Sequence, residues 1–127
     1  MVLVVEDDED DQEFITLAFN KATSKHKLHI TNNGQEALEY LSNLSLQHLP
    51  CLIVLDLNMP VLDGVQTLEA LKKMDRYQDI PKVIFTTSDS SDDRAKCLAI
   101  GANGYVVKPH NMKEIVNTIE NLLHYCR

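Results

Sequence analysis

The stretch V-V-E-D-D-E-D-D, from Val4 to Asp11, places six consecutive carboxylates directly after a run of aliphatic residues. The run Val2–Val5 lacks polar alternation, which predicts a strand buried on both faces. The carboxylates follow where that strand ends, although their mutual repulsion raises the energy of such a cluster. A solvated helix start and a divalent-cation site both account for this charge, and the remainder of the chain distinguishes the two.

Aliphatic runs alternate with helical patterns along the whole chain. The predicted strands are Val2–Val5, Leu28–Thr31, Cys51–Leu55, Val83–Phe85 and Tyr105–Val107. The predicted helices are Asp11–Lys25, Gly34–Leu46, one capped by Asp63, one from Ser90 to Ile100 that ends at Gly101, and one that begins near Met112. This alternation predicts an α/β fold, a parallel sheet with helices on both faces.

Helical spacing also predicts which side chains face the core. The set is Phe14, Leu17, Ala18 and Ala22 in the first helix, Ala37, Leu38 and Leu41 in the second, Val65, Leu68 and Leu71 in the third, and Met112, Ile115, Val116, Ile119, Leu122 and Leu123 in the last.

Length and composition favour one globular domain spanning residues 1–127, with no linker or repeat and no output domain after it. The formal net charge of −7 disfavours binding to nucleic acid or to an anionic membrane. No apolar stretch approaches the roughly 20 residues of a membrane span, and the acidic N-terminus does not resemble a signal peptide.

Three widely spaced cysteines, Cys51, Cys97 and Cys126, form no C-x-x-C pair. Their odd number and spacing predict a reducing cytoplasm and argue against a disulfide framework or a zinc site. Each is expected to be a small apolar filler or a helix-end residue.

The residues that follow the predicted strands define a candidate site, because ligands of open parallel sheets bind at the carboxyl ends of the strands. Strand one is followed by Glu6 and Asp7, strand three by Asp56, strand four by Thr86, and strand five by Lys108. Oxygen ligands without histidine or thiolate favour Mg²⁺, with open positions for phosphate oxygens. The set suits phosphoryl transfer, with Asp56 as the candidate nucleophile.

A nucleotide or flavin site on the same fold would need a glycine-rich or hydroxyl-rich turn after the first strand, to offer backbone N–H groups to a phosphate. Here that turn is acidic and lacks glycine, so it would repel a bare phosphate. The acidic run is therefore assigned to a metal, and only Glu6 and Asp7 need belong to it. The carboxylates from Asp8 to Asp11 and Glu13 are expected to favour the start of the helix or to be solvated.

In four segments the chain resembles the CheY-like receiver domain of bacterial response regulators: VVEDD, VLDLNMPVLDG, VIFTTSD and GANGYVVKP, in this order. The resemblance covers essentially the whole chain. It implies a flavodoxin-like, doubly wound sheet of five strands in the order 2-1-3-4-5, with five helices. The first acid is Glu6 where aspartate is common, which is a mild departure.

The resemblance also assigns roles to residues. It implies that Asp56 is the phospho-accepting aspartate, that Asp7, Asp56 and the backbone carbonyl of Asn58 bind Mg²⁺, and that Glu6 acts through water. Lys108 would contact the phosphoryl group, with a cis peptide to Pro109. Thr86 would be the switch hydroxyl, Tyr105 the aromatic side chain that responds to it, and Ser88 and Asn58 would tune the lifetime of the phosphoryl group.

The function implied is a stand-alone cytoplasmic phosphorylation switch rather than an enzyme with a separate substrate. A histidine kinase or phosphotransfer protein would phosphorylate Asp56, and the signal would appear on the face formed by the fourth helix, fifth strand and fifth helix. The domain would catalyse its own phosphorylation and slow dephosphorylation. The sequence does not identify the kinase or the target protein, and dimerisation through the last helices on phosphorylation remains open.

Two alternatives belong to other classes. A metal-dependent phosphatase with an aspartyl-phosphate intermediate needs a second acid two residues after the nucleophile, where this chain has Asn58, and it needs a cap domain. A scaffold with a vestigial site is disfavoured by the intact set of acids, hydroxyl and lysine. The five histidines show no ligand spacing and are expected at the surface or at helix ends: His26, His29, His48, His110 and His124.

Overall fold

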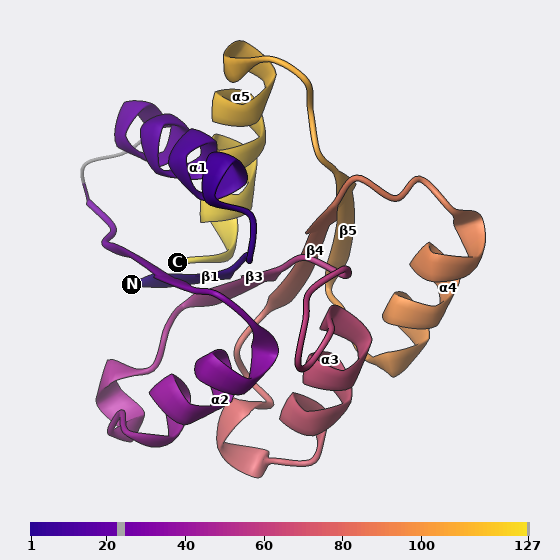
Figure 1. Ribbon diagram of the computed structural model, residues 1–127. Helices are drawn as coiled ribbons and strands as arrows, with labels where there is room; N and C mark the ends of the chain where they lie inside the picture. Colours follow the sequence, from indigo (N-terminus) through magenta and orange to yellow (C-terminus); the bar gives the residue numbers. More distant parts are fainter. Residues whose placement is uncertain (23–24, 127) are drawn as a thin grey trace.

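Five parallel strands form a single sheet in a computed structural model that describes residues 1–22 and 25–126 (Figure 1). The order across the sheet is β2-β1-β3-β4-β5. The strands are β1 (Val2–Val5), β2 (Leu28–Thr31), β3 (Leu52–Leu55), β4 (Lys82–Thr86) and β5 (Gly104–Val107). The predicted doubly wound α/β fold and the 2-1-3-4-5 order are confirmed.

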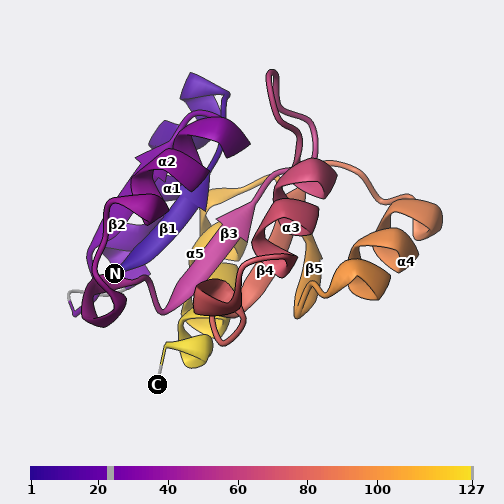
Figure 2. The same cartoon turned by 90° about the horizontal axis from the view of Figure 1, so that it is seen from below.

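Five α-helices cover the two faces of this sheet. Helices α1 and α5 pack against each other on one face, while α2, α3 and α4 lie in sequence on the other (Figures 1 and 2). They span α1 (Glu9–Ala22), α2 (Gly34–Ser42), α3 (Gly64–Lys72), α4 (Ser91–Ile100) and α5 (Met112–Leu122). Single 3₁₀ turns follow three of them, at η1 (Leu46–His48), η2 (Asp75–Tyr77) and η3 (Leu123–Tyr125).

Side-chain caps fix where four of these helices begin. Asn33, Ser90 and Asn111 each accept a hydrogen bond from a backbone N–H of the first helical turn. Asp63 caps α3 as predicted, and with Gln66 it forms a reciprocal capping box. Gly101 ends α4 with a φ of 127°, a conformation that glycine adopts without steric cost.

The core consists of two layers, one on each side of the sheet. Strands β1 and β3 are buried along their whole length, as their unbroken aliphatic sequences predict. One layer joins alternate strand residues to α2, α3 and α4, and the other joins the remaining strand residues to α1 and α5. Both faces of the sheet are therefore apolar, and polar groups gather at the ends of the strands.

The predicted inner face of the first helix was partly wrong. Helix α1 buries Ile15, Ala18 and Phe19, whereas the side chains of Phe14 and Leu17 are 46% and 47% exposed. The apolar residues of α1 lie on two adjacent stripes, so the sequence alone is compatible with either stripe facing the core. The packing of α1 against α5 selects one of them, and this leaves Phe14 and Leu17 in contact with solvent.

The prediction against a disulfide was also wrong. Cys51, just before β3, is bonded to Cys126, which follows η3, with their Cα atoms 5.0 Å apart. The two residues are 75 positions apart in sequence, so only the fold brings them together. Cys97 is a buried free thiol, as expected of an apolar filler.

The cis peptide expected before Pro109 is absent. None of the peptide bonds among residues 1–22 and 25–126 is cis. The expectation came from the family resemblance, and a lysine–proline sequence is compatible with both isomers.

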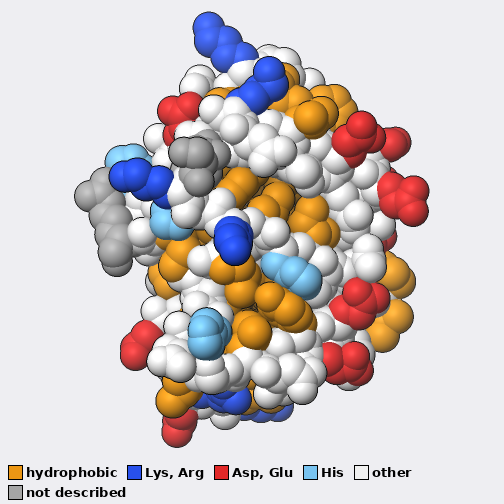
Figure 3. Space-filling view, turned by 90° about the vertical axis from the view of Figure 1, so that its left-hand side faces the viewer, with side chains coloured by type: hydrophobic (Ala, Val, Ile, Leu, Met, Phe, Trp, Pro, Cys, Tyr) orange, Lys and Arg blue, Asp and Glu red, His pale blue; other side chains and the backbone are white. Residues whose placement is uncertain are grey.

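The side of the molecule formed by α1, the β2 edge and α2 is mixed in character (Figure 3). Hydrophobic side chains gather at its centre among lysines and histidines, and acidic side chains lie toward the rim. His29, expected at the surface, is half-buried on β2 and stacks on Tyr40 with ring centroids 3.8 Å apart. Among the described residues, none of the helices has the length and apolar character needed to cross a membrane.

Candidate functional site

Three carboxylates meet at the carboxyl end of the sheet. In the parallel register Val5 pairs with Leu55, so the residues that follow them, Glu6 and Asp56, emerge side by side. An oxygen of each of these carboxylates and one of Asp7 lie within 4.8 Å of one another. Glu6 is 1% and Asp56 8% exposed, while Asp7 is more open to solvent. The predicted convergence of these three acids is therefore observed.

Lys108, which follows the edge strand β5, contacts these carboxylates at the same end of the sheet. Its ammonium nitrogen lies 2.6 Å from Glu6 Oε1 and 3.2 Å from Asp56 Oδ2. A third contact, 2.7 Å long, joins it to Asp11 Oδ2 in the first turn of α1. The side chain of Lys108 is only 9% exposed, so these contacts form in a largely desolvated setting where charges interact strongly.

Burial and charge shift the pKa values of two of these groups. Burial raises the pKa of Glu6 from 4.5 to about 7, against the hydrogen bond from Lys108, which lowers it. Burial by itself lowers the pKa of Lys108, but its hydrogen bonds to Asp11 and Glu6 outweigh that effect and raise the pKa above 10.5. Lys108 therefore remains positively charged at neutral pH, while the charge of Glu6 depends on what shares the site.

The loop after β3 fixes Asp56 from its backbone side. Asp56 Oδ1 accepts a hydrogen bond of 2.7 Å from the Leu57 N–H, which leaves Oδ2 to face Lys108. Gly64 packs directly against this segment, because a Cβ atom there would lie 2.3 Å from the Asp56 carbonyl oxygen. Asn58, two residues after Asp56, is exposed in the same loop.

The end of β4 and the start of β5 bring Thr86, Ser88 and Tyr105 together. Thr86 is fully buried, and its hydroxyl accepts a 3.3 Å hydrogen bond from the Ser88 N–H. The Tyr105 hydroxyl donates to the Ser88 carbonyl at 2.9 Å, and its ring is 7% exposed beneath Arg94 of α4. Tyr105 is thus turned inward and linked to Thr86 through one intervening residue.

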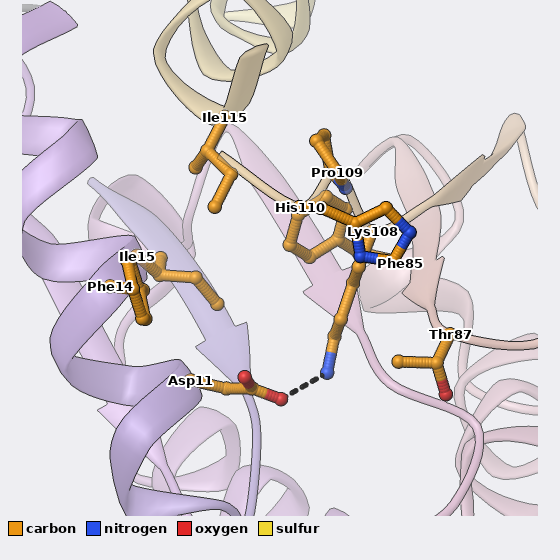
Figure 4. Close-up of a pocket in the computed structure, with 9 residues that line it drawn as sticks. All are labelled: Asp11, Phe14, Ile15, Phe85, Thr87, Lys108, Pro109, His110 and Ile115. Atoms are coloured by element: carbon orange, nitrogen blue, oxygen red, sulfur yellow. Dashed lines mark hydrogen bonds and ion pairs between the residues drawn. The ribbon is translucent and has the colours of Figure 1, made fainter. Parts of the chain in front are cut away.

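A pocket of about 230 Å³ opens beside Lys108, between α1 and the segment that leads into α5 (Figure 4). Phe14 and Ile15 line it from α1, and Pro109, His110 and Ile115 line it from the other side. Figure 4 shows Lys108 extending toward Asp11, with Thr87 on the opposite side of the lysine. The exposed ring of Phe14 and the charged cluster therefore share one opening.

Sequence reasoning missed Asp11. It assigned this residue to the positive end of the first helix, where Asp11 does lie, but its carboxylate also contacts Lys108. No local pattern marks Asp11, because its partner Lys108 follows β5 and is 97 positions away in sequence. Gln12 was missed as well; its amide donates to the Glu6 carbonyl at 2.6 Å and so anchors the start of α1 to the site.

Comparisons with known proteins place the whole arrangement in one family. The family model described as "Response regulator receiver domain" matches residues 2–120. The chain belongs to this family. Receiver domains are the phospho-accepting signalling switches of two-component systems.

Several members can be compared directly. The transcriptional regulatory protein PrrA of Mycobacterium tuberculosis is 38% identical over 122 residues, 96% of this chain but 49% of PrrA, so the chain spans about half of that relative. Response regulator Rcp1 of Synechocystis is 30% identical, with 96% of this chain and 85% of Rcp1 covered.

Solved structures agree with this assignment. The phosphorylated cyanobacterial phytochrome response regulator RcpA superposes with a TM-score of 0.86 at 29% identity, over 98% of this chain and 91% of RcpA. The Mn²⁺-bound form of Rcp1 superposes with a TM-score of 0.83 at 29% identity, over 98% of this chain and 92% of Rcp1.

The donor set of the receiver fits a hard divalent cation. Glu6, Asp7 and Asp56 offer carboxylate oxygens only, and no thiolate or imidazole is among them. Such ligands favour magnesium or manganese over zinc or copper. Because Asp7 is partly open to solvent, a cation held there would keep water molecules and have room for a phosphate oxygen.

Proposed function

We propose that the chain acts as a single-domain, cytoplasmic response regulator in which Asp56 accepts a phosphoryl group from a histidine kinase or a histidine phosphotransfer protein. The observation that carries this proposal is that the Asp56 carboxylate lies within 4.8 Å of those of Glu6 and Asp7 and 3.2 Å from the ammonium of Lys108. RcpA and Rcp1 are relatives of similar length, since this chain covers 91% and 92% of their solved chains.

The chemistry follows from the open oxygen of Asp56. Oδ1 is held by the backbone N–H of Leu57, whereas Oδ2 accepts a hydrogen bond only from the movable side chain of Lys108 among the described residues. Oδ2 is therefore assigned as the oxygen that attacks phosphorus as the bond from phosphorus to the histidine nitrogen breaks. Lys108, now 3.2 Å from Oδ2, would move its ammonium onto a phosphoryl oxygen and neutralise it. Mg²⁺ held by Asp7, Asp56 and the Asn58 carbonyl, with Glu6 acting through water, would supply the remaining positive charge.

The output is proposed to pass through Thr86 and Tyr105. A phosphoryl oxygen on Asp56 would attract the Thr86 hydroxyl, which now accepts from the Ser88 N–H. Movement there would alter the Ser88 carbonyl that holds Tyr105 and shift the equilibrium of the α4-β5-α5 face. Ser88 and Asn58 flank the phosphoryl group in this scheme and would tune its slow hydrolysis, while Pro109 would shape the segment that carries Lys108.

The partner is proposed to approach over the pocket between α1 and Pro109. A phosphohistidine carried on a helix needs an apolar surface next to the reacting oxygen, and the exposed Phe14 with Ile115 provides one beside Lys108. The downstream target is a protein that distinguishes the two states of the α4-β5-α5 face, and phosphorylation-dependent pairing of two copies through that face is one form this contact could take.

Intact-mass measurement after incubation with acetyl phosphate and Mg²⁺ tests the proposal. We expect one added phosphoryl group in the wild type, none with EDTA and none in Asp56→Asn. The exposed Asp92→Asn variant is the matched control and should be phosphorylated normally. Phosphorylation that persists in Asp56→Asn would refute the assignment of the acceptor.

A phosphate-release assay with a phosphomonoester, run beside the mass measurement, separates the switch from a phosphatase. A phosphatase that uses an aspartyl-phosphate intermediate requires an acid where this chain has Asn58. Sustained release of phosphate from a phosphomonoester would favour that class, whereas a single stoichiometric phosphorylation favours the receiver. A vestigial scaffold would show neither phosphorylation nor affinity for Mg²⁺.

A further inference from the structure

A second group of potential metal ligands lies at the opposite end of the sheet. Cys51 precedes β3, Cys126 follows η3, and His26 lies in the connection between α1 and β2. The two sulfur atoms and one ring nitrogen all lie within 4.8 Å of one another, and all three residues are half-buried. Figure 1 shows the reason: the end of the chain returns beside the start of the central strands.

This group is separate from the carboxylate site. Cys51 lies before β3 and Asp56 immediately after it, so the strand places them about 16 Å apart at about 3.3 Å per residue. No residue is common to the two groups. A cation bound at one end would therefore not use the ligands of the other.

The ligand chemistry of the two ends also differs. Two thiolates and an imidazole favour zinc-type cations, and disfavour the hard magnesium ion that prefers oxygen. We propose that Cys51, Cys126 and His26 form a thiol-dependent Zn²⁺ site, which exists when the Cys51–Cys126 disulfide is reduced. The half-buried setting leaves the fourth tetrahedral position open to water.

Local geometry supports this assignment. Around a tetrahedral zinc with bonds of about 2.3 Å, two thiolate sulfurs lie roughly 3.8 Å apart. The Cα atoms of Cys51 and Cys126 are 5.0 Å apart and their sulfurs are bonded to each other in this structure, so reduction leaves the two thiolates in one small space beside His26. The Cys51 N–H donates to the Met1 carbonyl at 2.9 Å, which fixes the cysteine at the start of β3.

The site would have two exclusive states. A dithiol reductant transfers two electrons and two protons to the disulfide, breaks the S–S bond and is itself oxidised to a disulfide. Zinc then binds the two sulfurs as thiolates, and their two protons leave to solvent. In a reducing compartment the dithiol form would prevail, so metal would replace the covalent bond as the link between the chain end and β3.

Cys97 provides a matched control within the same chain. It is a free thiol with 0% exposure, and burial raises its pKa. It is bonded to neither of the other cysteines and is not among the three grouped ligands. Its thiol is therefore inaccessible and resists deprotonation, so it should not contribute to binding of zinc.

Native mass spectrometry and cobalt substitution on the full chain test the proposal. After reduction and removal of the reductant without oxygen, the wild type should retain one Zn²⁺, and Co²⁺ should produce thiolate-to-cobalt charge-transfer absorption in the near ultraviolet. The disulfide form should retain none. Cys126→Ser should abolish the absorption, and His26→Gln should lower zinc affinity by at least the roughly 10-fold to 100-fold that loss of an outer-shell partner costs.

Two control variants define which results would refute the proposed zinc site. Cys97→Ser and Asp56→Asn should bind zinc as the wild type does. The proposal is refuted if the reduced wild type shows no thiolate absorption with Co²⁺, if Cys97→Ser loses it, or if the disulfide resists reduction in the folded protein. Failure of phosphorylation at Asp56 would leave these results unchanged, so the two proposals are tested independently.

Discussion

Lys108 Nζ lies 3.2 Å from Asp56 Oδ2, although these residues follow strands β5 and β3, which are separated in the sheet by β4. The lysine crosses over the end of β4 to reach the carboxylates of β1 and β3. Its charge therefore occupies the position where, under the proposed function, a cation and a phosphoryl group would later gather.

Replacement of Lys108 by methionine should destabilise the metal-free protein at neutral pH. The change leaves Glu6 and Asp56 without their positive partner, and loss of one partner of a buried ion pair costs about 3 to 5 kcal/mol. We expect a decrease in the free energy of unfolding toward the lower end of that range, because Glu6 can take up a proton. Urea denaturation in EDTA measures it.

Mg²⁺ should offset part of this loss, since a cation can replace the missing charge. The exposed Lys113→Met is the matched control and should change stability little. Equal stability of Lys108→Met and the wild type would show that the three carboxylate contacts contribute nothing.

Glu6 should make the stability of the metal-free protein depend on pH. Its pKa is about 7 in the folded protein and 4.5 ordinarily, so the folded state holds the proton more tightly. The resulting stabilisation is complete below about pH 4.5 and is lost as the pH rises through 7, by up to about 3 kcal/mol. Glu6→Gln should remove this slope, whereas the exposed Glu9→Gln should keep it. Urea denaturation between pH 4.5 and pH 8 would detect the difference, and parallel curves for Glu6→Gln and the wild type would contradict it.

Gly64→Ala should impair phosphorylation without touching a charged group. The new Cβ would lie 2.3 Å from the Asp56 carbonyl oxygen and 2.8 Å from Leu57 Cα, and backbone atoms cannot rotate away. Displacement of Asp56 by about 1 Å can cost up to about a hundredfold in rate. Gly104→Ala is the matched control, since its nearest contact is the Tyr125 hydroxyl at 3.4 Å. Initial rates with acetyl phosphate measure both, and equal rates would count against a close fit at Gly64.

The sequence predicted the sheet well, and it predicted that the site residues meet at the carboxyl ends of the strands. Unbroken aliphatic runs identify strands buried on both faces, and the residue after each strand identifies the contents of the site. Thus the meeting of Glu6, Asp7, Asp56 and Lys108 was predictable from the sequence. The cap at Asp63 was predictable for the same reason, because its signal is local.

The features that were missed depend on contacts between distant segments. The exposure of Phe14 and Leu17 follows from how α1 rotates against α5, which no local pattern specifies. The Cys51–Cys126 bond depends on the return of the chain to the start of β3. Asp11 looked like a helix-start residue and is one, and its second role appears only when Lys108 arrives from β5.

Phe14→Ala should separate the two kinds of phosphodonor. Phe14 is 46% exposed and lines the pocket beside Lys108, and its hydrocarbon ring has no group that could bind a cation ligand oxygen or a phosphoryl oxygen. Loss of an aromatic anchor at an interface typically costs more than about 1 kcal/mol, so transfer from a phosphorylated histidine phosphotransfer protein should slow roughly tenfold. Acetyl phosphate needs no such surface and should react at the wild-type rate. The matched control is Leu98→Ala, an apolar residue of α4 with 41% exposure and no place in this pocket, which should leave both rates unchanged. If Phe14→Ala slowed both donors equally, the residue would be acting on the reacting site itself, and the partner would have to approach from another side.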